Sequence, residues 1–275
     1  MTLDPRITPA NGRVALDGLQ GQVAADHFVQ GTPHSIITPL ADLRRSPAGA
    51  RDRQLLLGAD VLMLEDRAGW AYIQTLRDGY CGYVETACLG APAAPTHIIG
   101  VRASHLYPAA DVFVEAEEAL SFGARVRVVD ERAKFMEIAS GHFVPKAHLR
   151  LIDRPFSDPA TVAQQFFGTP YLWGGNSSAG IDCSGLVQAA LLACDHPCPG
   201  DSDMQASLGA ALSDEARLQR GDLLFWKGHV AMCVDGETLL HANAHHMATA
   251  YEPIAKAIAR IAAQDGGPVT ARRRP

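Results

Sequence analysis

The residues with the clearest chemical potential form the stretch Asp182-Cys183-Ser184-Gly185. The pair Gly174-Gly175 precedes this stretch and the apolar run 186–193 follows it. This order predicts a loop that delivers Cys183 to the first turn of a helix. Unpaired amide N–H groups and the positive end of the helix dipole stabilise a thiolate there, the form of sulfur that attacks carbonyl carbons. We therefore predict that Cys183 is a nucleophile, although a free cysteine is more commonly a small buried apolar residue.

Two histidines downstream supply a candidate base and a candidate orienting group. His229 and His241 flank a predicted hairpin whose loop contains Asp235-Gly236. A three-residue loop of Val234, Asp235 and Gly236, with the glycine in the left-handed conformation, places His229 directly opposite His241 on one face of the sheet. One histidine can then take the thiol proton while the other orients it. A two-residue turn would instead put the two side chains on opposite faces.

Length, composition and charge limit the remaining possibilities. With 275 residues and 47% apolar content, the chain is expected to build more than one compact unit. A net charge of −6, with a basic cluster only at residues 272–274, gives little support to nucleic-acid binding. Residues 1–30 lack the pattern of an export signal, and no later run approaches ~18 apolar residues, so we expect no membrane contact.

The six cysteines show no regular spacing, which predicts reduced thiols and a cytoplasmic protein. The short cluster Cys194-Asp195-His196-Pro197-Cys198 has no second ligand pair, so it is a weak indication of zinc. We expect a loop there, and neither a metal nor another cofactor in the activity. The adjacent residues His245 and His246 point to opposite faces of a strand and are interpreted as loop residues.

An internal repeat organises the first half of the chain. Gly58-Ala59-Asp60-Val61 returns as Gly123-Ala124-Arg125-Val126, and Tyr83-Val84 returns as Phe143-Val144. Within each copy, short runs alternate apolar and polar residues between turn residues, a pattern typical of strands that close into small barrels. It resembles bacterial SH3-type domains, which we place at residues 30–92 and 96–153. Residues 1–29 form an N-terminal extension whose fold the pattern leaves open.

From residue 155 to 275 the pattern predicts an α+β unit in a papain-like order, with the nucleophile on a helix and its partners on a sheet. The expected elements are a helix over 158–167, the cysteine helix, a strand over 220–226, hairpin strands over 229–234 and 238–243, a helix over 251–263 and a strand over 269–272.

Four motifs in this unit occur in a characteristic order: Trp173-Gly174-Gly175, Asp182-Cys183-Ser184-Gly185-Leu186, Gly221-Asp222-Leu223 and Gly228-His229-Val230. The segment resembles the NlpC/P60 family of cysteine peptidases. With two SH3-like domains in front, the whole chain is similar to the γ-D-glutamyl-L-diamino acid endopeptidases that process murein peptides during recycling. The resemblance implies a papain-like NlpC/P60 catalytic domain preceded by two small β-barrel SH3-like domains. It also implies hydrolysis of the γ-D-Glu to L-diamino acid bond in murein peptides with a free N-terminal L-Ala, which releases L-Ala-γ-D-Glu.

Carried onto this sequence, the resemblance implies Cys183 as nucleophile, His229 as general base and His241 as the residue that orients it. It further implies that the substrate's free amine is held by Asp182 and by an acid of the first SH3-like domain, which falls at Asp52 where relatives carry glutamate. An ammonium group that leaves water needs opposite charge within reach.

Four more residues match substrate contacts of the family: Tyr80, Trp173, Ser184 and Ser202. Each choice has a plainer alternative. Asp182 also suits the N-cap of the cysteine helix, a role that contributes about 1 kcal/mol, and we expect it to serve both purposes. Asp52 lies between two arginines and suits a surface charge, and Tyr80 and Trp173 suit ordinary core packing.

Two rival functions remain open: a non-catalytic murein-binding protein and a cysteine-dependent acyltransferase. The expected partner is a murein-derived peptide, without nucleic acid or membrane. The residues do not distinguish lysine from diaminopimelate in the substrate, and they leave the oligomeric state unknown.

Overall fold

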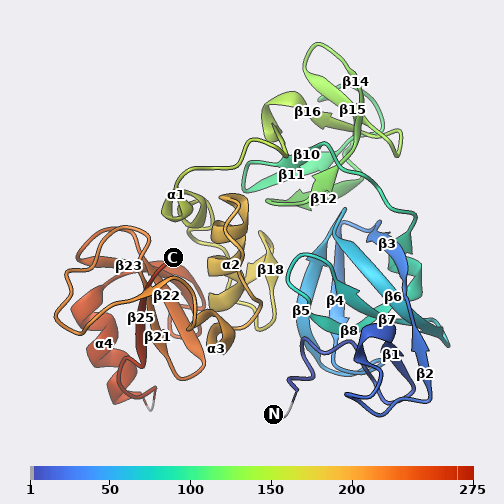
Figure 1. Cartoon of the computed structure of the whole chain (residues 1–275). Coiled ribbons are helices and arrows are strands. Elements are labelled where there is room, and N and C mark those ends of the chain that lie inside the picture. Colours follow the sequence, from blue (N-terminus) through green and yellow to red (C-terminus); the bar gives the residue numbers. More distant parts are fainter. Residues whose placement is uncertain (1–2, 265) are drawn as a thin grey trace. The chain divides into compact units, whose positions relative to one another are not determined.

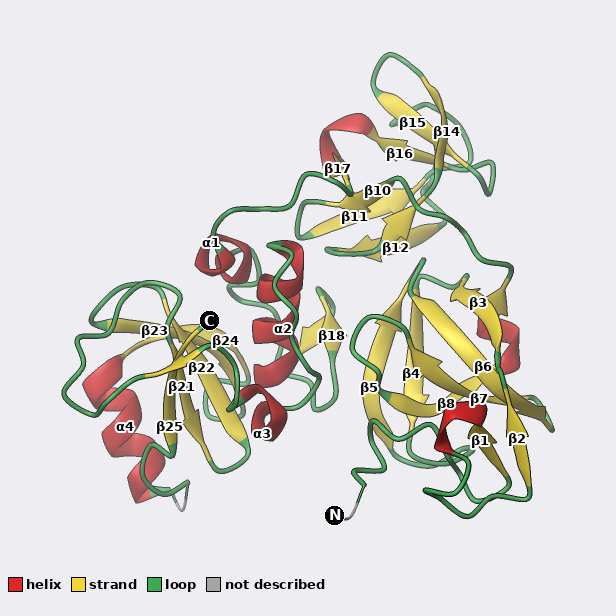
Figure 2. Cartoon of the chain, viewed as in Figure 1, coloured by secondary structure: helices red, strands yellow, loops and turns green. Residues whose placement is uncertain are grey.

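A computed structural model of the chain describes residues 3–264 and 266–275. They fall into two compact units that join in sequence between Ile152 and Asp153. The first unit is built mainly of strands, whereas the second unit combines strands and helices (Figure 2). The two units are described one after the other because each has its own core and its own candidate residues.

The first unit begins with two short strands and continues into an antiparallel sheet (Figure 1). The short strands β1 (Val14–Leu16) and β2 (His27–Val29) pair in parallel on either side of η1 (Asp17–Leu19). The antiparallel sheet has the order β5 (Arg51–Leu56), β4 (Leu40–Arg44), β8 (Cys81–Glu85), β7 (Trp70–Thr75), β6 (Asp60–Arg67), β3 (Thr32–Ile36) and β9 (Leu89–Gly90). The short helix η2 (Thr86–Cys88) precedes β9. Alternate side chains of these strands bury an apolar core that includes Leu43, Val61 and Ile73.

Residues 97–151 form three smaller sheets around a second apolar core. The sheets comprise β13 (Arg125–Val126), β10 (His97–Ile99) and β17 (Leu149–Leu151); β11 (Ala103–Leu106) and β12 (Glu118–Ser121); and β14 (Val128–Glu131), β15 (Phe135–Ile138) and β16 (Phe143–Pro145). The short helix η3 (Lys146–His148) precedes β17, as η2 precedes β9.

The two copies of the repeat share a backbone hydrogen-bond pattern at the glycine that occurs in both. The amide of Gly58 donates to the carbonyl of Ile36 over 2.8 Å, and the amide of Gly123 donates to the carbonyl of Ile99 over 2.9 Å. Both glycines have positive φ, a conformation that residues with a Cβ rarely adopt. A Cβ on Gly58 would also lie 2.3 Å from the carbonyl oxygen of Arg125, so glycine permits the two copies to touch.

The second unit is built on one six-stranded sheet with helices around it (Figure 1). The sheet order is β20 (Ala210–Ala211), β25 (Ala271–Arg274), β21 (Leu223–Trp226), β22 (His229–Cys233), β23 (Thr238–Asn243) and β24 (Ala248–Pro253). The helices are α1 (Pro159–Gln164), α2 (Cys183–Ala193), α3 (Ser202–Gln205) and α4 (Ile254–Ala263), and a small hairpin pairs β18 (Asn176–Ser177) with β19 (Gly180–Ile181). Helix α2 packs against α1, β22 and β23, and α4 packs against β23 and β24.

The hairpin between β22 and β23 is present, but its predicted register is wrong. Met232 pairs with Leu240 and Cys233 with Leu239, so the register is displaced by two residues from the one that would place His229 opposite His241. The loop comprises residues 235–237, and Gly236 does not have positive φ. The Asp235 carboxylate accepts hydrogen bonds from the amides of residues 237 and 238 and thereby sets this turn. A displacement by two preserves the face, so the two histidines still lie on one side of the sheet.

Other predicted element boundaries also differ from the structure. The strand expected over 220–226 begins only at Leu223, because a turn occupies the residues before it. The helix expected over 158–167 begins after its N-cap Asp158 but ends at Gln164. The helix expected from residue 251 begins at Ile254, because residues up to Pro253 pair with β23 as strand β24. The last strand is Ala271–Arg274, two residues later than expected.

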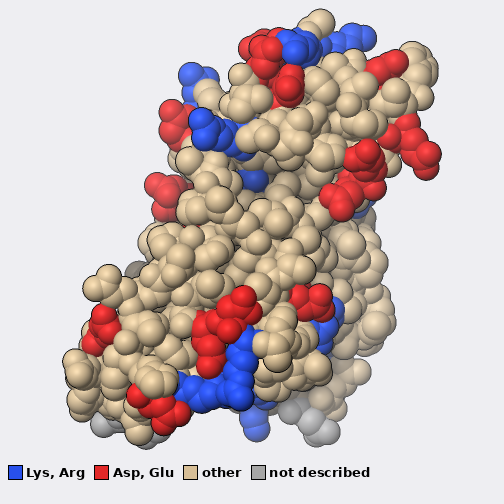
Figure 3. Space-filling view, turned by 90° about the vertical axis from the view of Figure 1, so that its right-hand side faces the viewer, with Lys and Arg blue, Asp and Glu red and all other residues tan. Residues whose placement is uncertain are grey.

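Charged side chains are distributed in mixed groups. On the face drawn in Figure 3, basic side chains lie beside acidic ones, and pairs such as Arg132 with Glu137 and Arg220 with Asp158 form ion pairs. No helix among the described residues is both long enough and apolar enough to span a bilayer.

Candidate active site

Cys183 is the first residue of α2, and Asp182 is the N-cap of that helix. Asp182 Oδ1 accepts hydrogen bonds from the Gly185 amide over 2.7 Å and from the Ser184 hydroxyl over 3.1 Å. Asp182 Oδ2 accepts a hydrogen bond from the Gly174 amide over 2.9 Å. The N-cap role considered for Asp182 is therefore present, and the same carboxylate also anchors the Trp-Gly-Gly loop to the start of the helix.

The glycines of these motifs permit close contact between the loop and the helix. A Cβ on Gly185 would lie 2.6 Å from the carbonyl oxygen of Gly175, and a Cβ on Gly175 would lie 2.5 Å from the carbonyl oxygen of Gly180. Real Cβ atoms do not approach backbone this closely, so both positions require glycine. The spacing of the Gly-Gly and Asp-Cys-Ser-Gly motifs thus reflects a backbone contact that holds Cys183 in place.

The thiol of Cys183 is buried, with only 7% of the residue exposed. Burial raises the pKa of Cys183 to about 12, and the negative charge of Asp182 adds to this effect. Amide groups of Val230, Ser184 and Cys183 itself act in the opposite direction, as predicted for a helix start, but they do not outweigh burial. Burial therefore opposes the thiolate expected at the helix start and favours the protonated sulfur in the free protein.

The backbone amide of Val230 is one of the groups that lower the pKa of Cys183. His229 directly precedes Val230, at the start of β22. In the described part of the chain, the Cys183 thiol and the His229 ring form no hydrogen bond with each other. Catalytic hydrogen bonds are commonly long before substrate binds. The structure therefore brings the helix start and the histidine strand together, without a formed thiol–imidazole bond.

His229 and His241 contact each other directly. His229 Nε2 and His241 Nδ1 are 2.9 Å apart, and their ring centroids are 5.1 Å apart. The ring of Trp226 lies beside His229, with centroids 5.7 Å apart. His241 is fully buried. The predicted pairing of the two histidines is present, even though their strands have a different register.

A carboxylate and a guanidinium that the sequence reasoning missed extend this pair. His241 Nε2 is 3.1 Å from Glu252 Oε2 on β24. Arg260 on α4 donates to both carboxylate oxygens of Glu252, over 2.9 and 2.7 Å. A signal was present in the sequence, because Glu252 is the one charged residue in the stretch 247–255. The prediction of a helix from residue 251 concealed it.

Burial keeps both histidines neutral. It lowers the pKa of His229 to about 3, with the neighbouring His241 as the second cause. Burial also lowers the pKa of His241 to about 4, against the opposing effect of Glu252. Arg260 is the main cause that lowers the pKa of Glu252 to about 2, so this carboxylate is ionised. An imidazole that is neutral at physiological pH is able to accept a proton.

Potential metal ligands also meet here. Single ligand atoms of His241, His246 and Glu252 lie within 4.8 Å of one another. In the structure these groups already have other partners, since Glu252 binds Arg260 and both ring nitrogens of His241 have contacts. His246 Nδ1 is 3.0 Å from Asn243 Oδ1. The polar contacts of this cluster are thus explained by hydrogen bonds within the chain.

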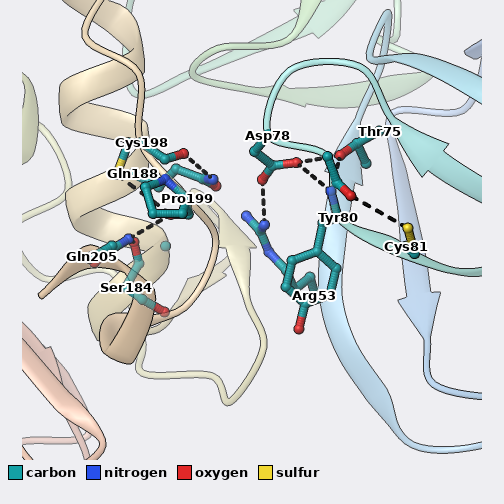
Figure 4. A network of polar contacts seen from close by, with 12 residues as sticks. Arg53, Thr75, Asp78, Tyr80, Cys81, Ser184, Gln188, Cys198, Pro199 and Gln205 are labelled. Atoms are coloured by element: carbon teal, nitrogen blue, oxygen red, sulfur yellow. Dashed lines mark hydrogen bonds and ion pairs between the residues drawn. The ribbon is translucent and has the colours of Figure 1, made fainter. Parts of the chain in front are cut away.

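Of the other predicted contacts in this unit, Ser184 is the most firmly held. Its hydroxyl binds Asp182, and its carbonyl accepts a hydrogen bond of 3.0 Å from Gln205 Nε2, which also binds the carbonyl of Pro199 (Figure 4). Ser202 is the first residue of α3. Trp173 is 71% exposed, so it is not a core aromatic.

The two predicted contacts in the first unit have different surroundings. Asp52 on β5 forms an ion pair with Arg45, with Nη2 and Oδ1 2.6 Å apart. Tyr80 is 3% exposed and belongs to the apolar core. The Arg53 guanidinium lies 4.9 Å from the centre of the Tyr80 ring and pairs with the half-buried Asp78, which also binds Thr75 (Figure 4). Core packing, the alternative considered for Tyr80, is therefore present.

Comparison with known proteins agrees with this arrangement. Residues 168–260 match the NlpC/P60 family, and residues 43–89 match the bacterial dipeptidyl-peptidase Sh3 domain. The chain is 36% identical over 93 residues to a gamma-D-glutamyl-L-lysine dipeptidyl-peptidase of Bacillus cereus, a match covering 31% of this chain and 28% of the relative. It is 33% identical over 119 residues to a probable endopeptidase NlpC of Escherichia coli, covering 38% of this chain and 73% of the relative.

A solved structure extends the likeness to most of the chain. The crystal structure of an NlpC/P60 family protein from Bacillus cereus aligns with 88% of this chain and 99% of its own length, with a TM-score of 0.74 and 20% identity. At this identity the likeness concerns the fold. The sequence match to the Bacillus cereus dipeptidyl-peptidase spans less than a third of that relative's length.

Proposed function

The chain belongs to the NlpC/P60 family and carries a bacterial SH3 domain, and from this premise we propose that it is a cysteine peptidase of murein peptides. The proposed reaction is hydrolysis of the bond between γ-D-Glu and an L-diamino acid in peptides with a free N-terminal L-Ala. The observation that supports it most strongly is a capped helix start bearing Cys183 beside a strand whose first residue, His229, binds His241.

In the proposed first step, His229 takes the thiol proton as the sulfur of Cys183 attacks the γ-carbonyl carbon. The resting pair is neutral, because the pKa of the thiol is raised and that of the imidazole is lowered. Proton transfer therefore accompanies attack. As the sulfur attacks, negative charge develops on the carbonyl oxygen of the substrate. Backbone N–H groups at the helix start are suitable hydrogen-bond donors to this oxygen.

The remaining steps return the site to its starting state. His229, now protonated, donates its proton to the leaving amine of the diamino acid as the C–N bond breaks, which leaves a thioester on Cys183. A water molecule then loses a proton to His229 and attacks the thioester carbon. Breakage of the C–S bond releases the new carboxylic acid, and the leaving sulfur takes the proton back from His229, which regenerates the thiol and the neutral imidazole. His241 serves throughout to orient His229.

Recognition of the free amine is assigned to Asp182, with Asp52 as a second proposed partner. Asp182 is held at the helix start, next to the nucleophile, because each of its carboxylate oxygens accepts a hydrogen bond from a backbone amide. Asp52 already balances Arg45. Trp173, Tyr80, Ser184 and Ser202 remain proposed contacts of the peptide. The exposed ring of Trp173 supports a role at the surface of the catalytic unit.

The proposed organisation keeps residues 30–92 and 96–153 as two SH3-like domains and 155–275 as the catalytic domain. The shared hydrogen bonds at Gly58 and Gly123, and the short helices η2 and η3 before the last strands, support a common ancestry of the two copies. We place the protein in the cytoplasm, in murein recycling. The irregular spacing of the six cysteines suits a reducing compartment.

A defined panel of murein tripeptides and tetrapeptides tests the proposal, with products identified by mass spectrometry. The wild-type protein should release L-Ala-γ-D-Glu, and Cys183→Ala should lower kcat/KM by at least about 10⁴-fold. Cys81→Ala is a matched control, since it removes another buried thiol with a raised pKa from the other unit. Turnover retained by Cys183→Ala, or products cleaved elsewhere, would refute the proposal.

A further inference from the structure

We propose that Glu252 and Arg260 are positioning residues that fix which ring nitrogen of His229 accepts the thiol proton. The inference rests on the proposed function, because it concerns the base of that reaction. Neither residue touches the sulfur. Their influence passes through His241, along an unbroken series of polar contacts from α4 through β24 and β23 to β22.

The direction of each hydrogen bond follows from the charge at the far end of this series. Arg260 donates two hydrogen bonds to Glu252, so Glu252 is a carboxylate and can only accept. His241 Nε2, 3.1 Å from this carboxylate, must therefore carry a hydrogen. Because His241 is neutral, its Nδ1 is then an unprotonated acceptor.

The same reasoning fixes the tautomer of His229. His241 Nδ1 is an acceptor, so the contact of 2.9 Å requires His229 Nε2 to donate. A neutral imidazole carries only one hydrogen, which leaves His229 Nδ1 unprotonated and able to take the proton of Cys183. The opposite orientation would place the hydrogen on His229 Nδ1, and this ring could not then act as the base.

A side chain without the negative charge would no longer enforce this order. An amide at position 252 presents either a carbonyl oxygen or an N–H group to His241 Nε2. When the N–H group faces His241, both imidazoles reverse their hydrogens. Glu252→Gln should therefore populate the unproductive tautomer and lower kcat/KM by about 10- to 100-fold, chiefly through kcat.

The unit contains a matched control for the loss of a buried carboxylate. Asp222 is 1% exposed and accepts two hydrogen bonds from Arg274, over 2.7 and 2.8 Å, as Glu252 does from Arg260. Among the described residues, no histidine contacts the Asp222 carboxylate, which also accepts a hydrogen bond from the backbone amide of Gln219. Asp222→Asn therefore removes a comparable ion pair and should leave kcat within about 3-fold of wild type.

The decisive measurement is ¹⁵N NMR of histidine-labelled protein without substrate, with His229→Gln and His241→Gln used for assignment. In wild type we expect a hydrogen on Nε2 and none on Nδ1 of both rings. Glu252→Gln should shift both rings toward the Nδ1–H form, and Asp222→Asn should not. Arg260→Lys keeps a positive charge beside the carboxylate and should retain the wild-type tautomers and most of the activity, whereas Arg260→Met should not.

The outcomes separate this inference from the proposed function. Unchanged tautomers in a folded Glu252→Gln protein, or the opposite tautomer in wild type, would overturn the positioning role even if peptides are cleaved. If Glu252→Gln fails to fold, the tautomers of Arg260→Lys and Arg260→Met are compared instead. Identical tautomers in these two variants would overturn the positioning role. Correct tautomers in a protein that cleaves no murein peptide would overturn the proposed function alone.

Discussion

The two units hold their candidate functional carboxylates in different ways. In the second unit, Asp182 binds the backbone at the start of the cysteine helix and Glu252 binds the imidazole of His241. In the first unit, Asp52 and Asp78 each pair with an arginine, Arg45 and Arg53. Glu252 also pairs with Arg260, so the difference from Asp52 is the added bond of Asp182 or Glu252 to the helix start or to the imidazole of the site. The contrast predicts larger effects of substitution in the second unit.

The largest expected difference between the units concerns acid. The pKa values of His229 and His241 in the folded protein, about 3 and about 4, lie below their ordinary value near 6.5. Between these values the unfolded chain binds more protons than the folded one. Stability from the neutral histidines is therefore complete above about pH 6.5 and decreases as pH falls. For His241 alone the loss by about pH 5 is on the order of 2 kcal/mol.

Urea unfolding at about pH 7 and about pH 5 checks this prediction. Tryptophan fluorescence of a Trp70→Phe variant reports on the second unit, which holds the other two tryptophans, Trp173 and Trp226. His241→Asn should show a smaller loss of stability between the two pH values than wild type. The first unit has His148, whose pKa burial also lowers, and we expect a smaller change there. Equal acid sensitivity of both units would contradict the comparison.

The next largest effect is expected from Asp182→Asn. Asparagine caps helices about as well as aspartate, but its amide nitrogen cannot accept the hydrogen bond from Gly174, so the unfolding free energy should fall by at least about 1 kcal/mol. The lost negative charge should lower kcat/KM for peptides with a free amine by about 10- to 100-fold. Acetylation of the substrate amine should impair the wild-type protein sharply and this variant much less. If acetylation impaired both proteins equally, Asp182 would have no role in binding the substrate amine.

The smallest effect is expected from Asp52→Asn in the first unit. Its ion pair with Arg45 has a largely exposed arginine, and such pairs contribute about 0–1 kcal/mol. We expect a decrease in kcat/KM of less than about 3-fold. Arg45→Gln breaks the same ion pair but keeps the Asp52 carboxylate. Comparing kcat/KM of the two variants therefore distinguishes loss of the ion pair from loss of the negative charge. A much larger loss in Asp52→Asn alone would show that the first unit contributes a strong substrate contact.

The catalytic candidates were predictable because local chemistry fixes them. Asp182 and Gly185 define the helix start in four consecutive residues, and the strands bearing His229 and His241 were identified within one residue of their ends. Side-chain alternation then kept the histidines on one face, although the Asp235 turn displaced the register by two. Short-range patterns therefore sufficed for the residues proposed to react.

The supporting residues were not predictable in the same way. Glu252 and Arg260 meet only because strand β24 pairs with β23 and α4 then folds back, and no short motif records that contact. The raised pKa of Cys183 likewise depends on burial by residues far apart in sequence. An argument from the helix dipole alone omits this burial, which opposes ionisation of the thiol.

The paired glycines Gly175 and Gly185 have a consequence for engineering this scaffold. Each lies so close to a neighbouring carbonyl oxygen that even a methyl group would collide with it. Saturation mutagenesis should thus yield no tolerated substitution at either position, including in variants that have been freed from any demand for activity. Efforts to redirect the protein toward new substrates should therefore vary residues such as Trp173 and leave Gly175 and Gly185 unchanged.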